Sequence, residues 1–452
     1  MPRVTGSILN TNEVAYPTSY KMDSLVLRNH EGREIDISAI VTDFNVTESI
    51  YVPSIILSAN VKDQVNLLEE FQLSGQESLR LKLSKRRMED QEDTEVDRYF
   101  IVTEYPTYGK FPNHLQTYTL KAISDFAYRS KFKKISRAFS GDVKDFIRVV
   151  LEHDLGVDPE NVHISDRDAY SASFIVPNLE PLDAIAWVLR RTYDGTGSPW
   201  YMYETFNEGI FVEPQSEMVS RNAYYTYKEG KFFNKDPYTK EDYKERRERI
   251  LSLASDLRMS KYIAGSSGAY GSTSEYIDIS NKTRLKTKFN YTDEYASMVW
   301  LNRGKNNLNP SFGFDQTPLS EFNQAQINYI PLNQKAFANH TNYHHGTYGG
   351  RINRAQSYLD NLDNITHDIK IAGDFGVSPG KVVGLELRKS IDPQAKVTGE
   401  NNESDYSDPF DRALSGNYLV SSVVHKFEQE YFCEVRLKKD SVNITLDSDT
   451  FL

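Results

Sequence analysis

Two strand patterns separated by a short helical pattern stand out in residues 48–83. In residues 55–62, apolar side chains occupy every second position, as a strand with one buried face requires. Residues 79–83 repeat this alternation as Leu-Arg-Leu-Lys-Leu. Between the two strands, Asp63 is placed to cap a helical turn that precedes a glycine-containing loop. The order predicts a half-buried antiparallel sheet with a small helix packed against it.

Strand patterns continue on both sides of this segment, so residues 20–129 are predicted to be mainly β. The acidic run 88–95 lies between two of the strands and is interpreted as a solvated hairpin loop. The predicted strands cover residues 21–28, 35–46, 54–62, 78–85, 98–105 and 115–126.

The apolar period becomes helical after residue 130. Residues 141–153 carry apolar side chains at helical spacing, with Ser140 or Asp142 as the cap. Pro181 begins a second helix, because proline suits a first helical turn. Two short aromatic strands follow, and residues 130–222 are therefore predicted to form an α+β domain.

The remaining chain alternates between helical, irregular and strand patterns. A charged amphipathic helix is predicted at 239–257 and another helix at 351–367. Residues 293–350 are rich in Asn, Gln, Gly and Tyr with weak periodicity, which indicates a loop-rich insertion. The acidic loop 392–415 is predicted to be solvated. Strand patterns occur at 262, 276–279, 285–291, 369–373, 381–388, 418–427, 431–437 and 442–446.

Composition limits the classes of function. A chain of 452 residues is too long for one core and predicts two to four domains. The 29 tyrosines and 23 phenylalanines suit strands and contact surfaces, although surface tyrosines are also common in plain β proteins. A net charge of −11 without a long basic block argues against tight nucleic-acid binding. A channel through which DNA slides would instead favour weakly binding walls.

Cysteine content and hydropathy indicate a protein that folds in a reducing cytoplasm. Cys433 is the one cysteine, so an intrachain disulfide is excluded. It alternates with Tyr431 and Val435 and is interpreted as a buried strand residue. The chain shows no apolar signal core and no window long enough for a membrane span, so no membrane anchor is expected.

Motifs for catalysis or cofactor binding were not found. The sequence has no phosphate-binding Gly-rich loop, no HExxH helix and no GxSxG elbow. The densest group of candidate ligands is His340, His344 and His345. Helical spacing would let His340 and His344 share a metal, but the neighbouring Asn and Gly residues favour an exposed loop or an interface. His425, in an otherwise apolar strand, is interpreted as a satisfied sheet residue. No catalytic, cofactor-binding or metal-binding residue is assigned.

Three segments together resemble a known family. The first is ESIYVPSIILSANVKDQVNLLEEFQLSGQESLRLKL at 48–83, and the second is PNLEPLDAIAW at 177–187, followed by GSPWYMYE and GIFV. The third combines SPGKVV at 378–383 with YLVSSVVHKF at 418–427. In order and spacing they resemble the baseplate hub proteins of contractile-tailed bacteriophages and the related hub domains of type VI secretion spike proteins.

The resemblance implies an α+β, mainly β fold with two similar antiparallel tube-type β-barrel domains, an inserted α+β domain and a loop-rich insertion. It covers most of the chain but neither the N-terminal arm nor the insertion. The expected domains are an arm at 1–19, a first barrel at 20–129, the α+β domain at 130–222, a charged helical connector at 223–257, a second barrel at 258–292 and 364–447, and the insertion at 293–363.

The resemblance also implies a structural virion protein rather than an enzyme. Such a hub is a homotrimer that adapts a threefold central spike to a sixfold tail tube, with DNA passing through its lumen. Implied partners are the spike, tail tube or tube-initiator proteins and baseplate wedge proteins, with assembly in the host cytoplasm. Residues expected in barrel packing or the ring interface are Ile55, Leu57, Val61, Leu79, Leu81, Leu83, Val420, Val424, Val435 and Leu437.

Two other classes of function are compatible with the sequence. One is a tail-associated hydrolase that acts on cell wall or polysaccharide. The other is a carbohydrate-binding tail module in which the tyrosines of residues 293–350 stack on sugars. Neither alternative accounts for β patterns at both ends of the chain that flank an α+β region.

Overall fold

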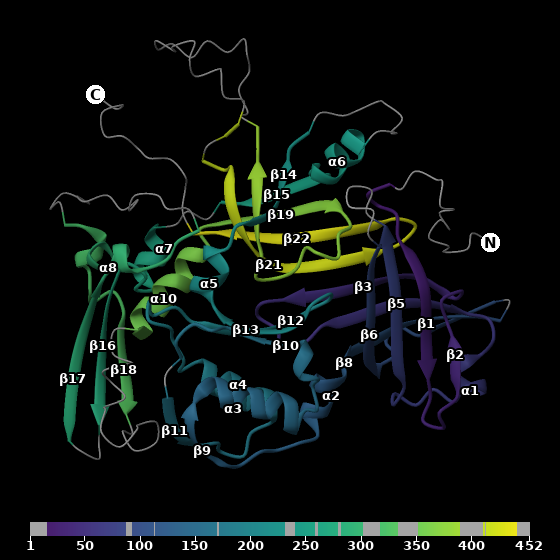
Figure 1. The fold of residues 1–452 in the computed structure, drawn as a ribbon, viewed down its shortest axis with the longest axis horizontal. Helices are drawn as coiled ribbons and strands as arrows, with labels where there is room; N and C mark the ends of the chain where they lie inside the picture. Colours follow the sequence, from purple (N-terminus) through teal and green to yellow (C-terminus); the bar gives the residue numbers. More distant parts are fainter. Residues whose placement is uncertain are drawn as a thin grey trace, which may run out of the picture.

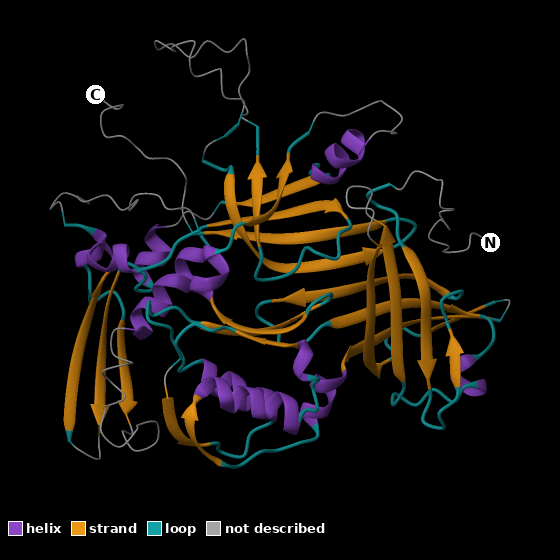
Figure 2. Ribbon diagram, viewed as in Figure 1, coloured by secondary structure: helices purple, strands orange, loops and turns teal. Residues whose placement is uncertain are grey.

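The structure of the protein is a computed structural model, in which strands dominate and the helices are short (Figure 2). It describes residues 16–86, 93–112, 114–169, 171–230, 240–257, 261–278, 282–301, 317–332, 351–388, 410–411 and 413–440. Within these ranges, fourteen strands form one continuous sheet, and the other strands form three small sheets. The α+β, mainly β fold predicted from the sequence is confirmed.

The first sheet unit, which we define as β1 to β8, is built from strands with one apolar face. In β4 the buried apolar side chains Leu57, Ala59 and Val61 alternate with more exposed polar residues, because successive side chains of a strand point to opposite faces. The strands are β1 (Lys21–Arg28), β2 (Glu34–Asp36), β3 (Val41–Ser49), β4 (Ile56–Asp63), β5 (Ser78–Arg86), β6 (Asp93–Glu104), β7 (Gly109–Phe111) and β8 (Leu115–Ser124).

The short helix between β4 and β5 is anchored by a buried carboxylate. Helix α1 (Leu67–Glu70) follows Asp63, which accepts hydrogen bonds from the backbone N–H groups of Val65 and Leu67, both at 2.8 Å. Leu67 and Phe71 are buried against the first sheet unit. The predicted order of strand, helical turn and strand is therefore present, but the N-cap residue is Asn66, and Asp63 is the last residue of β4, from which it holds the first N–H of the helix.

The second sheet unit consists of strands from residue 223 onward. Its apolar side chains join those of the first sheet unit in one continuous core. The strands are β14 (Ala223–Lys228), β15 (Ser252–Asp256), β19 (Ile365–Ala372), β20 (Val382–Glu386), β21 (Gly416–Phe427) and β22 (Tyr431–Lys439).

The two sheet units share a strand order. In the first, antiparallel neighbours run β3-β4-β8-β6-β5. In the second they run β15-β19-β22-β21-β20, again all antiparallel. Numbered along the chain within each unit, both sets read 1-2-5-4-3. A sixth strand differs, since β1 lies antiparallel to β5 whereas β14 lies parallel to β20. Two similar antiparallel units, as the resemblance implied, are therefore present.

An α+β unit lies against the large sheet (Figure 1). Asp142 caps α3 by accepting a 2.8 Å hydrogen bond from the Lys144 N–H, and Pro181 occupies the first turn of α4. A π-helical turn at Val150–Asp154 extends α3. The elements are α2 (Asp125–Lys131), β9 (Ala138–Asp142), α3 (Val143–Val149), β10 (Val162–Ile164), β11 (Ser171–Ile175), α4 (Pro181–Leu189), β12 (Trp200–Thr205), β13 (Gly209–Pro214) and α5 (Gln215–Ser220).

A separate three-stranded sheet, ordered β17-β16-β18, lies at the left of Figure 1. The expectation that 258–292 belongs to the second barrel is wrong for these strands, because the buried Tyr276 of β16 packs with Tyr193 and Ala355 rather than in the large core. Residue 262, expected in a strand, lies in a helix. The elements are α7 (Lys261–Ser266), β16 (Gly271–Asp278), β17 (Thr283–Asn290), α8 (Tyr291–Glu294), β18 (Ile327–Leu332) and α10 (Arg351–Leu362).

The two predicted helices at 239–257 and 351–367 are shorter than expected. Helix α6 (Lys240–Glu248) ends before β15, which pairs with β19 in the large sheet. Helix α10 ends at Leu362, and the alternating, buried Ile365, His367 and Ile369 form β19 instead. The connector at 223–257 thus contributes strands to the second sheet unit, because long-range pairing outweighs the local helical pattern.

Several expectations lie outside the described residues. These are most of the N-terminal arm, most of the acidic runs at 88–95 and 392–415, the strand at 442–446 and much of the insertion at 293–363. The boundaries of the domains stay a prediction.

We expect Asp63→Ala to lower the free energy of unfolding by about 2 kcal/mol, because two backbone N–H groups lose their acceptor in a buried site. Asp63→Asn, which keeps one acceptor oxygen, is the matched control and should cost less. Urea unfolding of both variants measures the difference, and equal losses would contradict the role of Asp63 as acceptor for these two N–H groups.

Candidate functional site

The two sheet units meet along β3 and β21, and we call this strand pair the junction. Six residue pairs run antiparallel, from Ser422 opposite Ser49 to Phe427 opposite Phe44. The Ile50 N–H also donates to the Ser421 carbonyl at 3.0 Å. Backbone hydrogen bonding therefore continues from one unit into the other and makes a single sheet of them.

One edge of strand β21 pairs with strands of both sheet units. Its residues 416–419 pair with β20, whereas residues 422–427 pair with β3. A β-bulge between Val420 and Ser422 marks the point where the partner changes. A bulge bends a strand and shifts its alternation by one residue.

Because of the bulge, Val424, one of the ten residues predicted for barrel packing, does not lie in the core. Val423, His425 and Phe427 point into the core, and Val424 is half-exposed on the opposite face. The other nine lie in the continuous core at 2% exposure or less: Ile55, Leu57, Val61, Leu79, Leu81, Leu83, Val420, Val435 and Leu437. A role of any of these residues in a ring interface stays a prediction.

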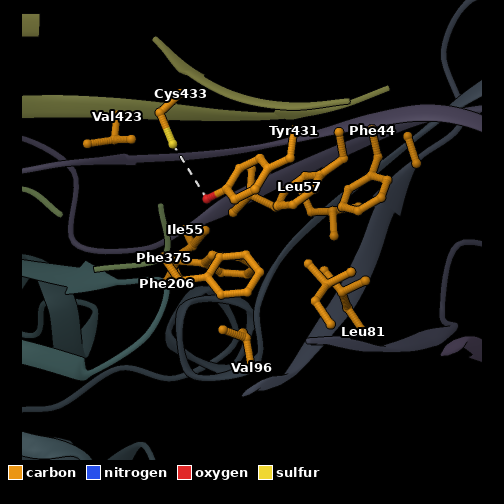
Figure 3. Close-up of a cluster of buried hydrophobic side chains, with 14 of the residues drawn as sticks. Phe44, Ile55, Leu57, Leu81, Val96, Phe206, Phe375, Val423, Tyr431 and Cys433 are labelled. Carbon is orange, nitrogen blue, oxygen red and sulfur yellow. Dashed lines mark hydrogen bonds between the residues drawn. The ribbon is translucent and has the colours of Figure 1, made fainter. Parts of the chain in front are cut away.

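Aromatic rings from both units stack beneath the junction (Figure 3). The Phe44 and Phe427 rings are stacked with centroids 4.5 Å apart, and the Phe427 and Tyr431 rings are stacked at 4.3 Å. Tyr20 approaches Phe427 edge-on at 5.2 Å. These large side chains bury much apolar surface where the two sheet units meet, so they hold the junction together.

A chain of buried polar groups crosses the junction. The Glu48 Oε1 atom of β3 lies 3.0 Å from Nε2 of His425 on β21. The other ring nitrogen, Nδ1, lies 2.7 Å from the Tyr431 hydroxyl oxygen and 3.4 Å from Sγ of Cys433. Glu48, His425, Tyr431 and Cys433 are all exposed by 1% or less. Each polar group thus has a partner, as burial requires.

The charge state of His425 follows from these neighbours. Burial lowers the pKa of the imidazole, but Cys433 and the hydrogen-bonded Glu48 carboxylate outweigh it and raise this pKa to about 10. The neighbours of His425 in the junction therefore favour the protonated form of its imidazole. Removing either Glu48 or His425 would leave the other without its hydrogen-bond partner in the core, which is destabilising.

The thiol, imidazole and carboxylate stand in the order of a nucleophilic catalytic triad. However, the side chains of Cys433, His425 and Glu48 are enclosed in the core, and a substrate would have to reach the sulfur through the packed sheet. The arrangement therefore supports a structural role, in agreement with the interpretation of His425 and Cys433 as sheet residues.

The turn between β12 and β13 inserts into the junction from the α+β unit. Phe206, at the tip of this turn, is fully buried, with its ring 5.2 Å from His425 and 5.9 Å from Phe375. Its N–H donates to Glu48 at 2.6 Å, and its carbonyl accepts from Arg98 of β6 at 2.8 Å. One turn thus contacts both sheet units and the polar chain between them.

Two further contacts hold this turn. Lys381, which precedes β20, pairs with Glu208 at 2.6 Å. Glu204 of β12 accepts hydrogen bonds from the Ile55 N–H at 3.0 Å and from the Ser124 hydroxyl. Burial raises the pKa of Glu204 to about 7, against which the bonds from Ser124 and Ile55 act. The α+β unit is therefore fastened to the first sheet unit by Glu204, a carboxylate that is only partly ionised at neutral pH, and to the second by the Glu208–Lys381 pair.

The sequence contained a signal for some of these residues. Glu48 follows Phe44 and Val46 at spacing two, which places a charged group on the apolar face of β3. His425 likewise lies two residues from Val423 and from Phe427, which places it on the apolar face of β21. Nothing local distinguished Phe206, because its burial depends on units that are far apart in the sequence.

The predicted histidine cluster His340, His344 and His345 lies outside the described residues. In the parts of the chain that the structure does describe, no group of three or more His, Cys, Asp or Glu side chains is arranged to hold a metal ion. Among these same residues, no helix has the length and apolar character needed to cross a membrane.

Known proteins resemble this chain in structure and not detectably in sequence. No protein-family model matches, and no curated protein matches in sequence. The tail protein from Neisseria meningitidis MC58 aligns over 94% of this chain and 97% of its own, with a TM-score of 0.50 and 11% identity. The 43 kDa tail protein of prophage MuSo2 from Shewanella oneidensis aligns over 93% and 99%, with a TM-score of 0.51 and 8% identity.

A looser structural alignment extends to type VI secretion. The E. coli c3393 protein, a component of that system, aligns over 93% of this chain and 76% of its own, with a TM-score of 0.43 and 8% identity. The two tail proteins define the class: this chain has the fold of phage tail proteins, over nearly its whole length. The fold implied by the hub resemblance is thereby confirmed.

We expect Phe206→Ala to lower the free energy of unfolding by about 3–5 kcal/mol, because it opens a cavity where three units meet. Phe132→Ala, at a side chain that is 76% exposed, is the control and should change little. Urea unfolding measures both, and a small effect at Phe206 would show that the turn does not hold the units together.

The raised pKa of Glu204 predicts a pH-dependent effect. Because the folded-state pKa exceeds the unfolded value of 4.5, this group's contribution is fully present below pH 4.5 and is lost as pH rises through about 7. Glu204→Gln cannot ionise and should gain roughly 3 kcal/mol relative to the native protein between pH 4.5 and pH 8. Parallel pH profiles of unfolding free energy would contradict this, and the exposed Glu95→Gln is the control.

Proposed function

We propose that this protein is a structural virion component, a homotrimeric baseplate hub that adapts a threefold central spike to a sixfold tail tube. The observation that carries the proposal is the repeated strand order of the two sheet units and their edge-to-edge pairing at the junction. Three chains with two such units each supply six, which matches a sixfold tube on one side and a threefold spike on the other.

The outward face of the large sheet suits the wall of a channel. In the first sheet unit, Asn60 donates to Asp43 at 2.7 Å, and Thr119 donates to Asn60 at 3.0 Å, which forms a polar row across β3, β4 and β8. The face of the second sheet unit has a hollow of about 440 Å³ between β15, β19, β22 and β21. We infer that this face lines the lumen.

Charges on the same face of the second sheet unit are paired. Arg436 donates to Asp368 at 2.8 Å, and Lys426 pairs with Glu434 at 2.6 Å. Affinity for DNA depends mainly on unpaired cations that replace counterions at phosphates. A wall of paired charges would therefore let DNA pass without holding it.

The proposed partners follow from this geometry. One end of the ring would contact the central spike, and the other would contact the tail tube or tube-initiator proteins, with baseplate wedge proteins outside. The protein would assemble in the host cytoplasm and reside in the virion as part of the tail baseplate. The alternatives of a hydrolase or a carbohydrate-binding module rest on residues 293–350, and no described feature favours them.

We expect light scattering coupled to size exclusion to give three times the chain mass of 51.9 kDa, alone or with the candidate spike protein. Negative-stain images of the complex should show a ring with a central opening. A stable monomer that ignores the spike would overturn the proposal.

A further inference from the structure

The separate sheet β17-β16-β18 has an inner face that packs against helix α10 and an outer face that points away from it. On the inner face, Tyr276 of β16 packs with Ala355 of α10. Successive side chains of a strand point to opposite faces, so the neighbours of Tyr276 belong to the outer face. The residues of β16 on the outer face are therefore Thr273, Glu275 and Ile277.

One side of the outer face is a row of cations on β17. The three residues that lie opposite the outer-face residues of β16 are Arg284, Lys286 and Lys288. All three are exposed. Glu275 of β16 pairs with Arg284 and, at 3.4 Å, with Lys286. One carboxylate thus lies beside three cations, and the row keeps a surplus of positive charge in a chain whose net charge is −11.

The other side of the outer face is a row of apolar side chains on β18. The residues that lie beside the outer-face residues of β16 are Ile327, Tyr329 and Pro331. Ile327 is 38% exposed and Tyr329 is 64% exposed, whereas Ile330 between them packs on the inner face. Tyrosine and arginine are enriched among the residues that contribute most to protein interfaces, and the outer face offers both.

The spacing of the two rows sets the shape of a partner. Neighbouring strands lie about 4.8 Å apart, so the cation row and the apolar row are about 10 Å apart across β16. An α-helix with its side chains is about 10–12 Å wide and would contact both rows, whereas an extended strand would cover only one. At one end of the face, Thr273 donates to the Asn323 carbonyl at 2.7 Å, so the helix would lie over Glu275 and Ile277.

We propose that the outer face of β17-β16-β18 binds an amphipathic helix of another protein, with carboxylates along one flank of the helix and apolar side chains along the other. The carboxylates pair with the cation row, which selects the partner and speeds association. The apolar flank packs on Tyr329 and its neighbours, which supplies buried area. The face lies outside both sheet units and outside the segments that carry the hub resemblance, so the proposal goes beyond the trimeric hub.

A single-stranded nucleic acid is the main rival occupant, because its phosphates would also meet the cation row. Its bases bind by stacking on successive aromatic rings. The apolar row offers one ring, Tyr329, between the aliphatic side chains of Ile327 and Pro331, and the Glu275 carboxylate lies between the two rows. These features favour the apolar side chains of a protein over a run of bases.

Binding of a designed peptide to the full chain tests the proposal. The probe is a fluorescent helical peptide of about 18 residues, with Glu along one flank and Leu along the other, and anisotropy measures its binding. We expect saturable binding that weakens as salt is raised, because salt screens exposed charges. The same peptide with Gln in place of Glu, and a single-stranded oligothymidine of equal length, should each bind at least about tenfold more weakly.

Charge variants assign the binding to the cation row. Lys286→Gln combined with Lys288→Gln should weaken peptide binding about tenfold at low salt and little at high salt. The matched control is Lys121→Gln combined with Lys110→Gln on the first sheet unit, where Lys121 pairs with Glu104 as Lys286 pairs with Glu275. This control should bind the peptide as the native protein does.

An aromatic variant tests the apolar row. Tyr329→Ala should weaken peptide binding about tenfold at both low and high salt, because the lost contact is apolar. Tyr108→Ala, at a side chain of the first sheet unit that is 51% exposed, is the control and should leave binding unchanged.

The outcomes separate this proposal from its rivals. If the acidic peptide does not bind, or if the variants of the outer face bind it as the native protein does, the proposal is wrong. If oligothymidine binds more tightly than the peptide and the double lysine variant abolishes this binding, the face is a nucleic-acid site and the protein partner is wrong. Light scattering of the same samples tests the hub separately, since a monomer that binds the peptide would contradict the trimer and support this proposal.

Discussion

The pairing of β3 with β21 is the interaction on which the rest of the structure depends. It joins two strands separated by more than 350 residues of sequence, and it merges the cores of their units into one. Backbone hydrogen bonds give direction and register to this contact, and the stacked rings of Phe44, Phe427 and Tyr431 supply the buried apolar area. Without it, each unit would present an open strand edge at this position.

Buried polar groups give the junction specificity that apolar contact alone would lack. A strand that slips by one residue would move His425 away from Glu48 and expose or orphan both groups in the core. The N–H of Phe206 and the guanidinium of Arg98 extend the same requirement to the α+β unit. We infer that the polar chain selects a single arrangement of the three units, and that its value lies in this selection more than in net stability.

The repeated strand order places this junction between two similar units. The chain contains the same five-strand arrangement twice, and the junction covers an edge of each. The bulges in β6 and β21 lie at equivalent positions, and in β21 the bulge marks the point where one strand edge changes its partner from β20 to β3. Such features follow from the geometry of the sheet and leave no simple trace in composition.

The sequence by itself determined the local elements and most of the core. Alternation predicted β4, β5 and β22, and Pro181 marked the start of α4, because one residue in two or a single proline is enough to specify these features. Nine of the ten residues chosen for packing are buried for the same reason.

Tertiary structure decided the features that depend on residues far apart in the chain. The bulge in β21 places Val424 on the outer face of the sheet. Residues 252–256, which have a helical pattern, instead form a strand that pairs with β19. Strand β16 pairs with β18 rather than with the large sheet. Glu48 contacts His425 although the two residues are 377 positions apart in the sequence, and the Phe206 N–H donates to Glu48. Periodicity reports which face of an element is apolar, whereas the partner that covers the face depends on long-range pairing that no local pattern contains.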